Sequence, residues 1–161
     1  MSLTLDHDAP PPGFLPHTRH SPLTEPWEPI HSRTTDGAVL VGLRLRSVHA
    51  NGRGIAHGGL IAALADNAMG LSCGLGLPQG TSLLTVSLSV DYLGIARLGQ
   101  WLQVDTTFVK TGGTLCFAQA FVRADGLDCA RANATFRRLD PTSPMAAVKD
   151  ESGSPDFHNM D

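Results

Sequence analysis

Charged and aromatic side chains are scarce in this chain of 161 residues. Only 17% of the residues are Asp, Glu, Lys or Arg, and 6% are Phe, Trp or Tyr. Because charged residues usually make up about a quarter of a globular chain, this composition indicates a compact protein, part of whose apolar surface is covered by a partner subunit. The 12 Lys and Arg are scattered and the formal net charge is −3, which argues against a nucleic-acid partner.

Long apolar runs and paired cysteines are also absent from the sequence. No run approaches the roughly 18–20 apolar residues that cross a bilayer, and the first residues do not read as a secretory signal. We therefore expect a cytoplasmic protein with no membrane partner. The three cysteines, Cys73, Cys116 and Cys129, have no CxxC or His-paired spacing. This spacing predicts reduced, buried thiols, and no other cluster suggests a metal or redox cofactor.

The distribution of proline divides the chain. Residues 1–29 hold most of the 11 prolines, and we expect them to form a loose, flexible arm. Residues 140–161 are rich in Ser, Asp and Pro and are typical of a disordered tail. The remaining stretch, 30–139, is long enough for one domain with its own core.

Periodicity within 30–139 predicts one helix and several strands. The helix is expected from about Gly58 to Ser72. Strict alternation in 84–92 places Leu84, Val86 and Leu88 on one face and Thr85 on the other. Because the helix is apolar nearly all round, we expect an α+β fold in which an antiparallel sheet wraps around it. The other strand-like runs are 39–45, 100–110, 114–124 and 128–138.

One carboxylate interrupts the predicted helix. Asp66 falls on the face opposite Leu60 and Leu64, with Ala62, Ala63, Met69 and Gly70 as neighbours at helical spacing. An isolated buried charge is costly, so this side chain must be desolvated, paired or used in a site. A satisfied structural carboxylate is the alternative interpretation.

The predicted start of the helix is His57-Gly58-Gly59. Unpaired N–H groups and a partial positive charge at a helix start favour a developing oxyanion. Asp66 lies about 12 Å further along the helix, too far to act on the same carbonyl within one subunit. We infer a site shared across a dimer interface. A tight helix entry, with Asn51 serving only as a turn residue, remains the alternative.

The same residues recur in a recognisable order. Asn51, His57-Gly58-Gly59, Asp66, the run 86–93 and the run 110–113 resemble the hotdog-fold thioesterase superfamily, specifically the PaaI-type acyl-CoA thioesterases, over about residues 38–139. The resemblance implies a sheet wrapped around one long central helix, dimers whose sheets join, and homotetramers built from two dimers. It also implies hydrolysis of an aryl- or medium-chain acyl-CoA, with no cofactor beyond the coenzyme A of the substrate.

The resemblance further implies a role for each matching residue. Asp66 would be the general base or nucleophile, and the Gly58 N–H, together with Gly59, would polarise the thioester carbonyl from the other subunit. Three residues would orient the thioester or the attacking water: Asn51, His57 and Thr85. Thr85 is also compatible with an ordinary strand position.

Substrate contacts are expected on the small residues of the helix and on two basic residues. The acyl group would lie near Ala62, Ala63, Met69 and Gly70. Arg97 and Lys110 are candidate contacts to the phosphates of coenzyme A, although both also fit solvated surface charges. The pair Gly94-Ile95 stands where many relatives have Arg-Pro, which removes one possible phosphate contact.

Two other functions fit the same fold. A hotdog hydratase or dehydratase would pair a His with an acidic residue, but His57 belongs to the helix start and the Asp-x-Asn-Pro-x-His pattern of that branch is absent. A non-catalytic acyl-CoA-binding protein would retain its ligand intact.

Overall fold

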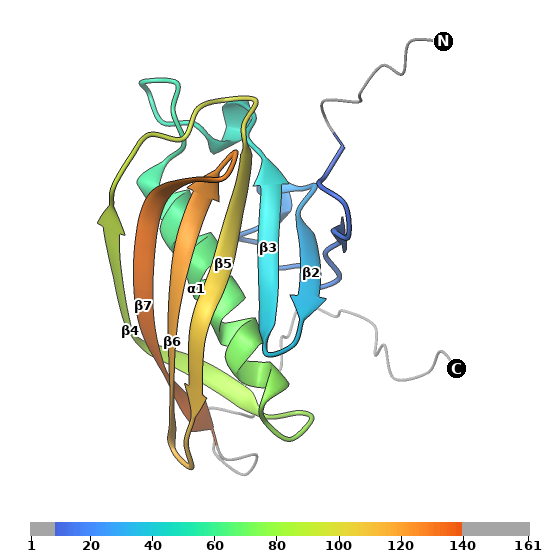
Figure 1. The fold of residues 1–161 in the computed structure, drawn as a ribbon, viewed down its shortest axis with the longest axis vertical. Helices are drawn as coiled ribbons and strands as arrows, with labels where there is room; N and C mark the ends of the chain where they lie inside the picture. The colour runs from blue at the N-terminus through green and yellow to red at the C-terminus, as the bar shows by residue number, and fades with distance from the viewer. Residues whose placement is uncertain (1–8, 140–161) are drawn as a thin grey trace.

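The computed structural model describes residues 9–139, in which one long helix packs against a seven-stranded antiparallel sheet (Figure 1). The helix is α1 (Gly58–Leu75). In the sheet the strands follow the order β1-β2-β3-β5-β6-β7-β4. Their bounds are β1 (Leu15–Pro16), β2 (His31–Thr35), β3 (Ala38–Arg44), β4 (Ser82–Tyr92), β5 (Trp101–Thr111), β6 (Leu115–Ala124) and β7 (Leu127–Leu139). The expected fold class is confirmed, and the tail expected at 140–161 lies outside the described residues.

Helix α1 is the centre of the core. It contacts strands β3 to β7, and Leu64, Ala65 and Ala68 are at most 1% exposed. By length and a mean hydropathy of 1.2 it meets the criterion for a membrane span, which differs from our expectation that no stretch does. Its contacts with five strands explain the composition, since a helix enclosed by a sheet needs apolar side chains on most of its faces.

Strand β4 contains a bulge that changes which of its side chains face the helix. The pairing of β4 with β7 shifts between Thr85 and Ser87. An extra residue in one strand reverses the alternation beyond it, so Thr85 faces α1 together with Leu88, while Leu84 is 38% exposed. Our assignment of Thr85 to the face opposite Leu88 was therefore wrong, because strict alternation ignores the bulge.

The segment before β2 is built into the fold instead of forming the loose arm that we expected. Strand β1 pairs with β2, and Phe14 is 6% exposed in a small cluster with Leu40 and Trp101. The ring of Trp101 occupies the space that a side chain on Gly42 would fill. Two short 3-10 helices, η1 (Glu25–Trp27) and η2 (Ser47–His49), complete the described structure. Pattern analysis missed β1 and β2 because the first has 2 residues and the second carries polar residues on both faces.

This packing predicts that Phe14→Ala destabilises the protein by about 2–3 kcal/mol, because a largely buried aromatic ring is lost. Urea unfolding followed by tryptophan fluorescence measures the change. Leu15→Ala is the matched control, since Leu15 is 69% exposed and should change stability by less than about 0.5 kcal/mol. Equal effects of the two substitutions would contradict the packing described for this segment.

Candidate active site

Asp66 and Thr85 form a hydrogen-bonded pair between α1 and β4. The Thr85 hydroxyl donates to the carboxylate at 2.9 Å from Oδ1 and 3.2 Å from Oδ2. Burial raises the pKa of Asp66 above its usual value, and the Thr85 hydrogen bond partly opposes this. Among the described residues no Lys, Arg or His forms an ion pair with Asp66. A half-buried carboxylate without a counter-ion is suited to accept a proton.

The pair lies at the wall of a chamber of about 870 Å³, a size typical of small-molecule sites. The chamber runs along the side of α1 that faces neither β5 nor β6. Helix residues on this wall are Leu64, Asp66, Asn67, Gly70, Leu71, Gly74 and Leu75. Nothing lies within 4 Å of a Cβ built on Gly74, so a side chain at that position has open space around it.

The start of α1 presents a different set of groups. His57 caps the helix, its Nδ1 accepting the N–H of Gly59 at 2.9 Å. The Gly59 N–H is therefore occupied, which corrects our expectation that it shares in polarising a carbonyl. The Gly58 N–H has no acceptor among the described residues. It is the group at the helix start that is positioned to bind an incoming oxygen.

Tyr92 contacts this helix start, and Asn51 lies in the turn that precedes it. The Asn51 side chain accepts the N–H of Arg53 at 2.8 Å, as in the local turn that we considered, and its amide Nδ2 has no acceptor among the described residues. Tyr92, at the end of β4, donates to the Gly58 carbonyl at 2.6 Å. A Cβ on Gly58 would lie 3.1 Å from the Tyr92 ring, so glycine permits this close approach.

The structure thus divides the expected site residues into two groups on one helix. Asn51, His57 and Gly58 lie at the helix start, and Asp66 with Thr85 lies two turns along α1. The chamber is lined by the second group and by none of the first. Each group has its own hydrogen bonds, but a single protomer does not bring the two groups together into one site.

Most of the residues that we expected to contact the substrate lie outside the chamber. Gly70 lines the chamber, but Ala62 and Ala63 do not, and Met69 is 0% exposed within the core. Our prediction for Met69 was wrong because the part of the helix that faces the chamber is narrower than the small residues around Asp66 suggested. Arg97 and Lys110 are exposed near opposite ends of β5, so one protomer does not direct both at the same phosphate.

Sequence reasoning missed Tyr92 as part of the helix start, and it missed residues before β2 that line the chamber. Tyr92 is the single tyrosine of the chain and ends a strand-like run, which is a weak signal. Nothing in the proline-rich segment suggested a contribution to a site. Within residues 9–139 no group of three His, Cys, Asp or Glu side chains is arranged to hold a metal ion.

Comparison with known proteins identifies relatives of the whole domain. Residues 53–130 match the model of the thioesterase superfamily. The protein PA0474 of Pseudomonas aeruginosa, which is named as an esterase, is 35% identical over 127 residues, covering 78% of this chain and 95% of its own length. Human acyl-coenzyme A thioesterase 13 is 32% identical over 83 residues, or 50% of this chain and 57% of that protein.

A solved structure shows the same fold with coenzyme A. The crystal structure of BH2602 from Bacillus halodurans with CoA matches with a TM-score of 0.62 and 29% identity, covering 68% of this chain and 73% of the other. On its sequence and on its fold, the chain belongs to the thioesterase superfamily and is a hydrolase acting on thioester bonds.

Proposed function

We propose that this protein hydrolyses the thioester of an aryl- or medium-chain acyl-CoA in a site that two subunits complete together. One subunit supplies Asp66 and Thr85, and the other supplies the Gly58 N–H with Asn51 and His57. The observation that carries the proposal is the Asp66 carboxylate, which lies at the wall of the chamber without a counter-ion among residues 9–139. The name of the human relative and the CoA bound to BH2602 support coenzyme A as the thiol component.

The chemistry uses groups that are present in the two half-sites. Asp66 takes a proton from water, whose oxygen attacks the thioester carbon, and the resulting oxyanion is stabilised by the Gly58 N–H. The C–S bond then breaks, and the leaving thiolate recovers the proton from Asp66. Direct attack by Asp66 would instead give a mixed anhydride that water hydrolyses. His57 Nδ1 is engaged in capping the helix, which disfavours the proton shuttle of a hydratase.

Strand β4 supports the pairing of two subunits. It is an edge strand of 11 residues, and a long edge with exposed apolar side chains usually needs a cover. Thr85 near one end contacts Asp66, and Tyr92 at the other end contacts Gly58. If two β4 strands pair antiparallel about a twofold axis near Leu88, Thr85 of one lies opposite Tyr92 of the other. Asp66 then approaches the helix start of the partner.

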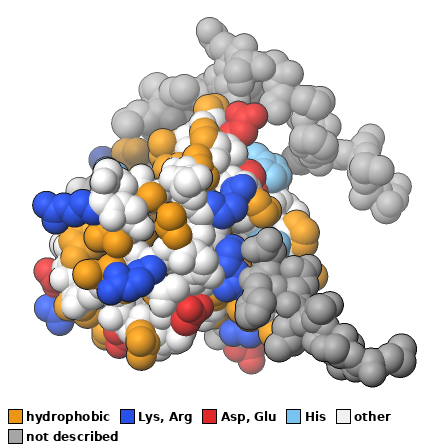
Figure 2. Space-filling model, turned by 90° about the horizontal axis from the view of Figure 1, so that it is seen from above, with side chains coloured by type: hydrophobic (Ala, Val, Ile, Leu, Met, Phe, Trp, Pro, Cys, Tyr) orange, Lys and Arg blue, Asp and Glu red, His pale blue; other side chains and the backbone are white. Residues whose placement is uncertain are grey.

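Exposed apolar side chains lie where such a partner would pack. Figure 2 looks onto the end of the molecule where α1 begins, and apolar side chains are mixed there with basic ones. Tyr92, Leu93 and Ile95 are each more than half exposed near this end. On the sheet face away from α1, Phe108 and Phe117 are 47% and 43% exposed, and we propose that a second dimer covers them in a tetramer.

The phosphates of coenzyme A would then meet basic residues of both subunits. Arg97 lies beside the loop that leads into α1, since Ile55 and Arg97 form an isolated bridge. Lys110 lies near the far end of β5, so it would contact the phosphates only from a different subunit than Arg97 does. We keep both as proposed contacts, with Arg97 on the subunit that supplies Gly58.

Replacing Asp66 by Asn should lower kcat for acyl-CoA hydrolysis at least about a hundredfold. Thiol release from hexanoyl-CoA and phenylacetyl-CoA measures this. The melting temperature at neutral pH should not fall, because burial raises the pKa of Asp66 and its ionisation therefore costs stability above that pKa. Full activity in the Asn variant would remove Asp66 from the mechanism.

Gly58→Pro should reduce kcat about 10²–10³-fold, because proline suits the first helical position but lacks the N–H that binds the oxyanion. Gly58→Ala is the matched control, since it adds a Cβ beside Tyr92 and keeps the N–H. Comparable losses in the two variants would show that crowding of Tyr92, and not the missing N–H, lowers the rate.

Thr85→Val should move the acid limb of the pH profile of kcat/KM to higher pH. The Thr85 hydrogen bond lowers the pKa of Asp66, so its loss raises that pKa, and the active carboxylate forms only at higher pH. Ser89, on the same strand, forms no hydrogen bond with Asp66. The control variant Ser89→Ala should therefore leave the acid limb in place. An unchanged limb in the Val variant would argue against Asp66 as the titrating base.

A further inference from the structure

One side of the chamber is bounded by the loop that joins β1 to β2. Strands β2 and β4 lie near opposite edges of the sheet, and residues from both line the chamber together with α1. Residues 17–30, which we call the N-terminal loop, supply the wall between these edges through His17, Arg19, Ser21 and Thr24. The chamber therefore ends on a part of the chain that lies outside the match to the thioesterase model.

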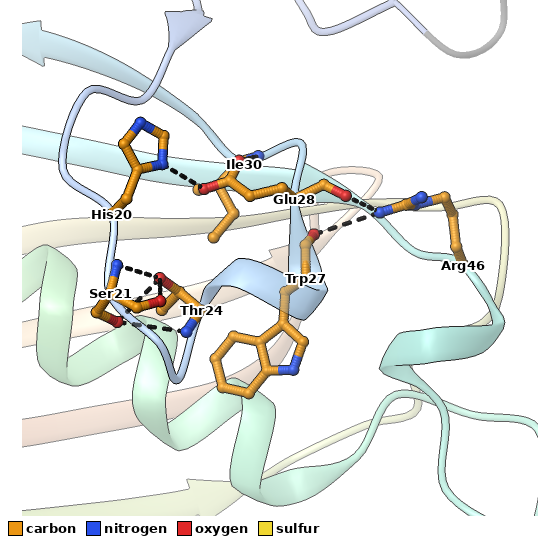
Figure 3. A network of polar contacts seen from close by, with 7 residues as sticks. All are labelled: His20, Ser21, Thr24, Trp27, Glu28, Ile30 and Arg46. Carbon is orange, nitrogen blue, oxygen red and sulfur yellow. Dashed lines mark hydrogen bonds and ion pairs between the residues drawn. The ribbon is translucent and has the colours of Figure 1, made fainter. Parts of the chain in front are cut away.

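The N-terminal loop is held by several contacts (Figure 3). At its neck the His17 N–H donates to the Ile30 carbonyl at 2.9 Å, and His20 lies 3.1 Å from the Glu28 carboxylate. Ser21 and Thr24 form a compact turn through their hydroxyls, 3.0 Å apart. These internal contacts give the N-terminal loop a defined conformation, so it forms a structured wall of the chamber.

The same loop is tied to the segment that leads to the helix start. Arg46 donates to the carbonyls of Trp27 and Glu28 (Figure 3). His49, which is 1% exposed, accepts the Arg46 N–H through Nδ1 at 2.9 Å. Its Nε2 therefore carries the proton and donates to the Trp27 carbonyl at 3.0 Å. These bonds fix the N-terminal loop relative to η2 and the segment that leads into α1.

Strand β2, which follows the N-terminal loop, turns hydroxyl groups toward the chamber. Ser32 and Thr34 share one face of β2, and both line the chamber together with Ile30, which precedes the strand. This is the face toward α1, where neighbouring β3 carries the buried Val39 and Val41. A sheet face that packs on a core helix is normally apolar, and the hydroxyls of the half-buried Ser32 and the exposed Thr34 depart from that pattern. Their hydroxyls donate no hydrogen bond to a described residue.

The charged residues of the chamber lie on two different walls. Among the described lining residues Asp66 is the one carboxylate and Arg19 the one Lys or Arg side chain. Asp66 lies on the wall with β4, and Arg19 lies on the N-terminal loop. The lining also includes the apolar side chains of Val39, Leu64 and Phe136. A ligand that fits has an apolar middle, with its reacting carbon at Asp66 and a hydrogen-bonding group at the other end.

We infer that Ser32 and Thr34, with Arg19 of the N-terminal loop, select acyl groups that carry an oxygen at the end far from the thioester. Ser32 is half-buried, while Thr34 and Arg19 are exposed. An acyl chain that covers these hydroxyl and guanidinium donors displaces their water, and a saturated chain offers no acceptor in its place. This inference rests on the proposed thioesterase function, because it takes the chamber as the acyl site. The shared chemistry is a terminal oxygen, which either a hydroxyl or a carboxylate supplies.

The experiment compares butanoyl-, hexanoyl- and octanoyl-CoA, each as the plain chain, the ω-hydroxy form and the ω-carboxy form. For the chain length that fits best, kcat/KM should be about tenfold higher with a terminal oxygen than without. In Ser32→Ala/Thr34→Val this ratio should fall about tenfold, because the oxygenated chain loses its donors and the plain chain no longer leaves hydroxyls unpaired. Thr34→Ser should keep the preference. Thr35→Val, on the opposite face of β2, is the matched control and should keep it too.

Arg19→Gln separates the two sources of the oxygen. If the terminal group is a carboxylate, this variant lowers kcat/KM for the ω-carboxy chain and leaves the ω-hydroxy chain unchanged. If the group is a hydroxyl, neither changes and the wild type prefers the ω-hydroxy form. Equal rates for plain and oxygenated chains, with no effect of the double variant, would overturn the inference while leaving the thioesterase proposal intact.

A binding measurement keeps the two proposals separable if no acyl-CoA is hydrolysed. Calorimetric titration of Asp66→Asn with hexanoyl-CoA and 6-hydroxyhexanoyl-CoA gives the affinities without turnover. Tighter binding of the hydroxylated chain, lost in the background of Ser32→Ala/Thr34→Val, would support the chamber wall even though hydrolysis had failed. Equal affinities in both backgrounds would reject it.

Discussion

The structure depends on holding one carboxylate in an otherwise apolar helix. Asp66 has a single described hydrogen-bond donor, the Thr85 hydroxyl, and no described counter-ion. Burial raises its pKa, so the folded protein carries an electrostatic cost that a purely structural residue would avoid. The bulge in β4 turns Thr85 toward the helix. Without that irregularity the carboxylate would lose its partner.

The same strand connects the two half-sites. Its first half holds Asp66 through Thr85, and its last residue holds the helix start through Tyr92. In the proposed dimer an antiparallel pair of β4 strands would exchange these ends between subunits, so that groups about 12 Å apart along one helix would meet across the interface. This separation within one protomer is our reason for proposing a symmetric assembly.

Much of the fold was predictable from sequence, because periodicity is strong where one face of an element is buried. The helix and the five strands from β3 to β7 follow from apolar spacing at positions such as Val41, Leu64 and Val104. Asp66 and the His57-Gly58 helix start were also found, since a charge among apolar residues and glycines at a helix start have local signatures.

What the sequence did not predict depends on contacts between distant segments. The β4 bulge determines that Thr85 faces α1. The burial of Phe14 depends on the Trp101 ring, whose centroid lies 5.2 Å from that of Phe14. Ser32 and Thr34 looked like ordinary polar residues because their face is defined only by the chamber. Met69 was misplaced for the converse reason, since a small-residue neighbourhood does not show which helix face the sheet covers.

The most direct measurement of the shared site is subunit complementation between Asp66→Asn and Gly58→Pro. The two chains carry different affinity tags, are co-expressed, and assemblies containing both are purified and assayed for thiol release. Each mixed dimer would hold one site built from an intact Gly58 and an intact Asp66. The account predicts about half the wild-type rate per dimer, although each variant alone is inactive. A mixed dimer as inactive as its parents would contradict a site shared between subunits.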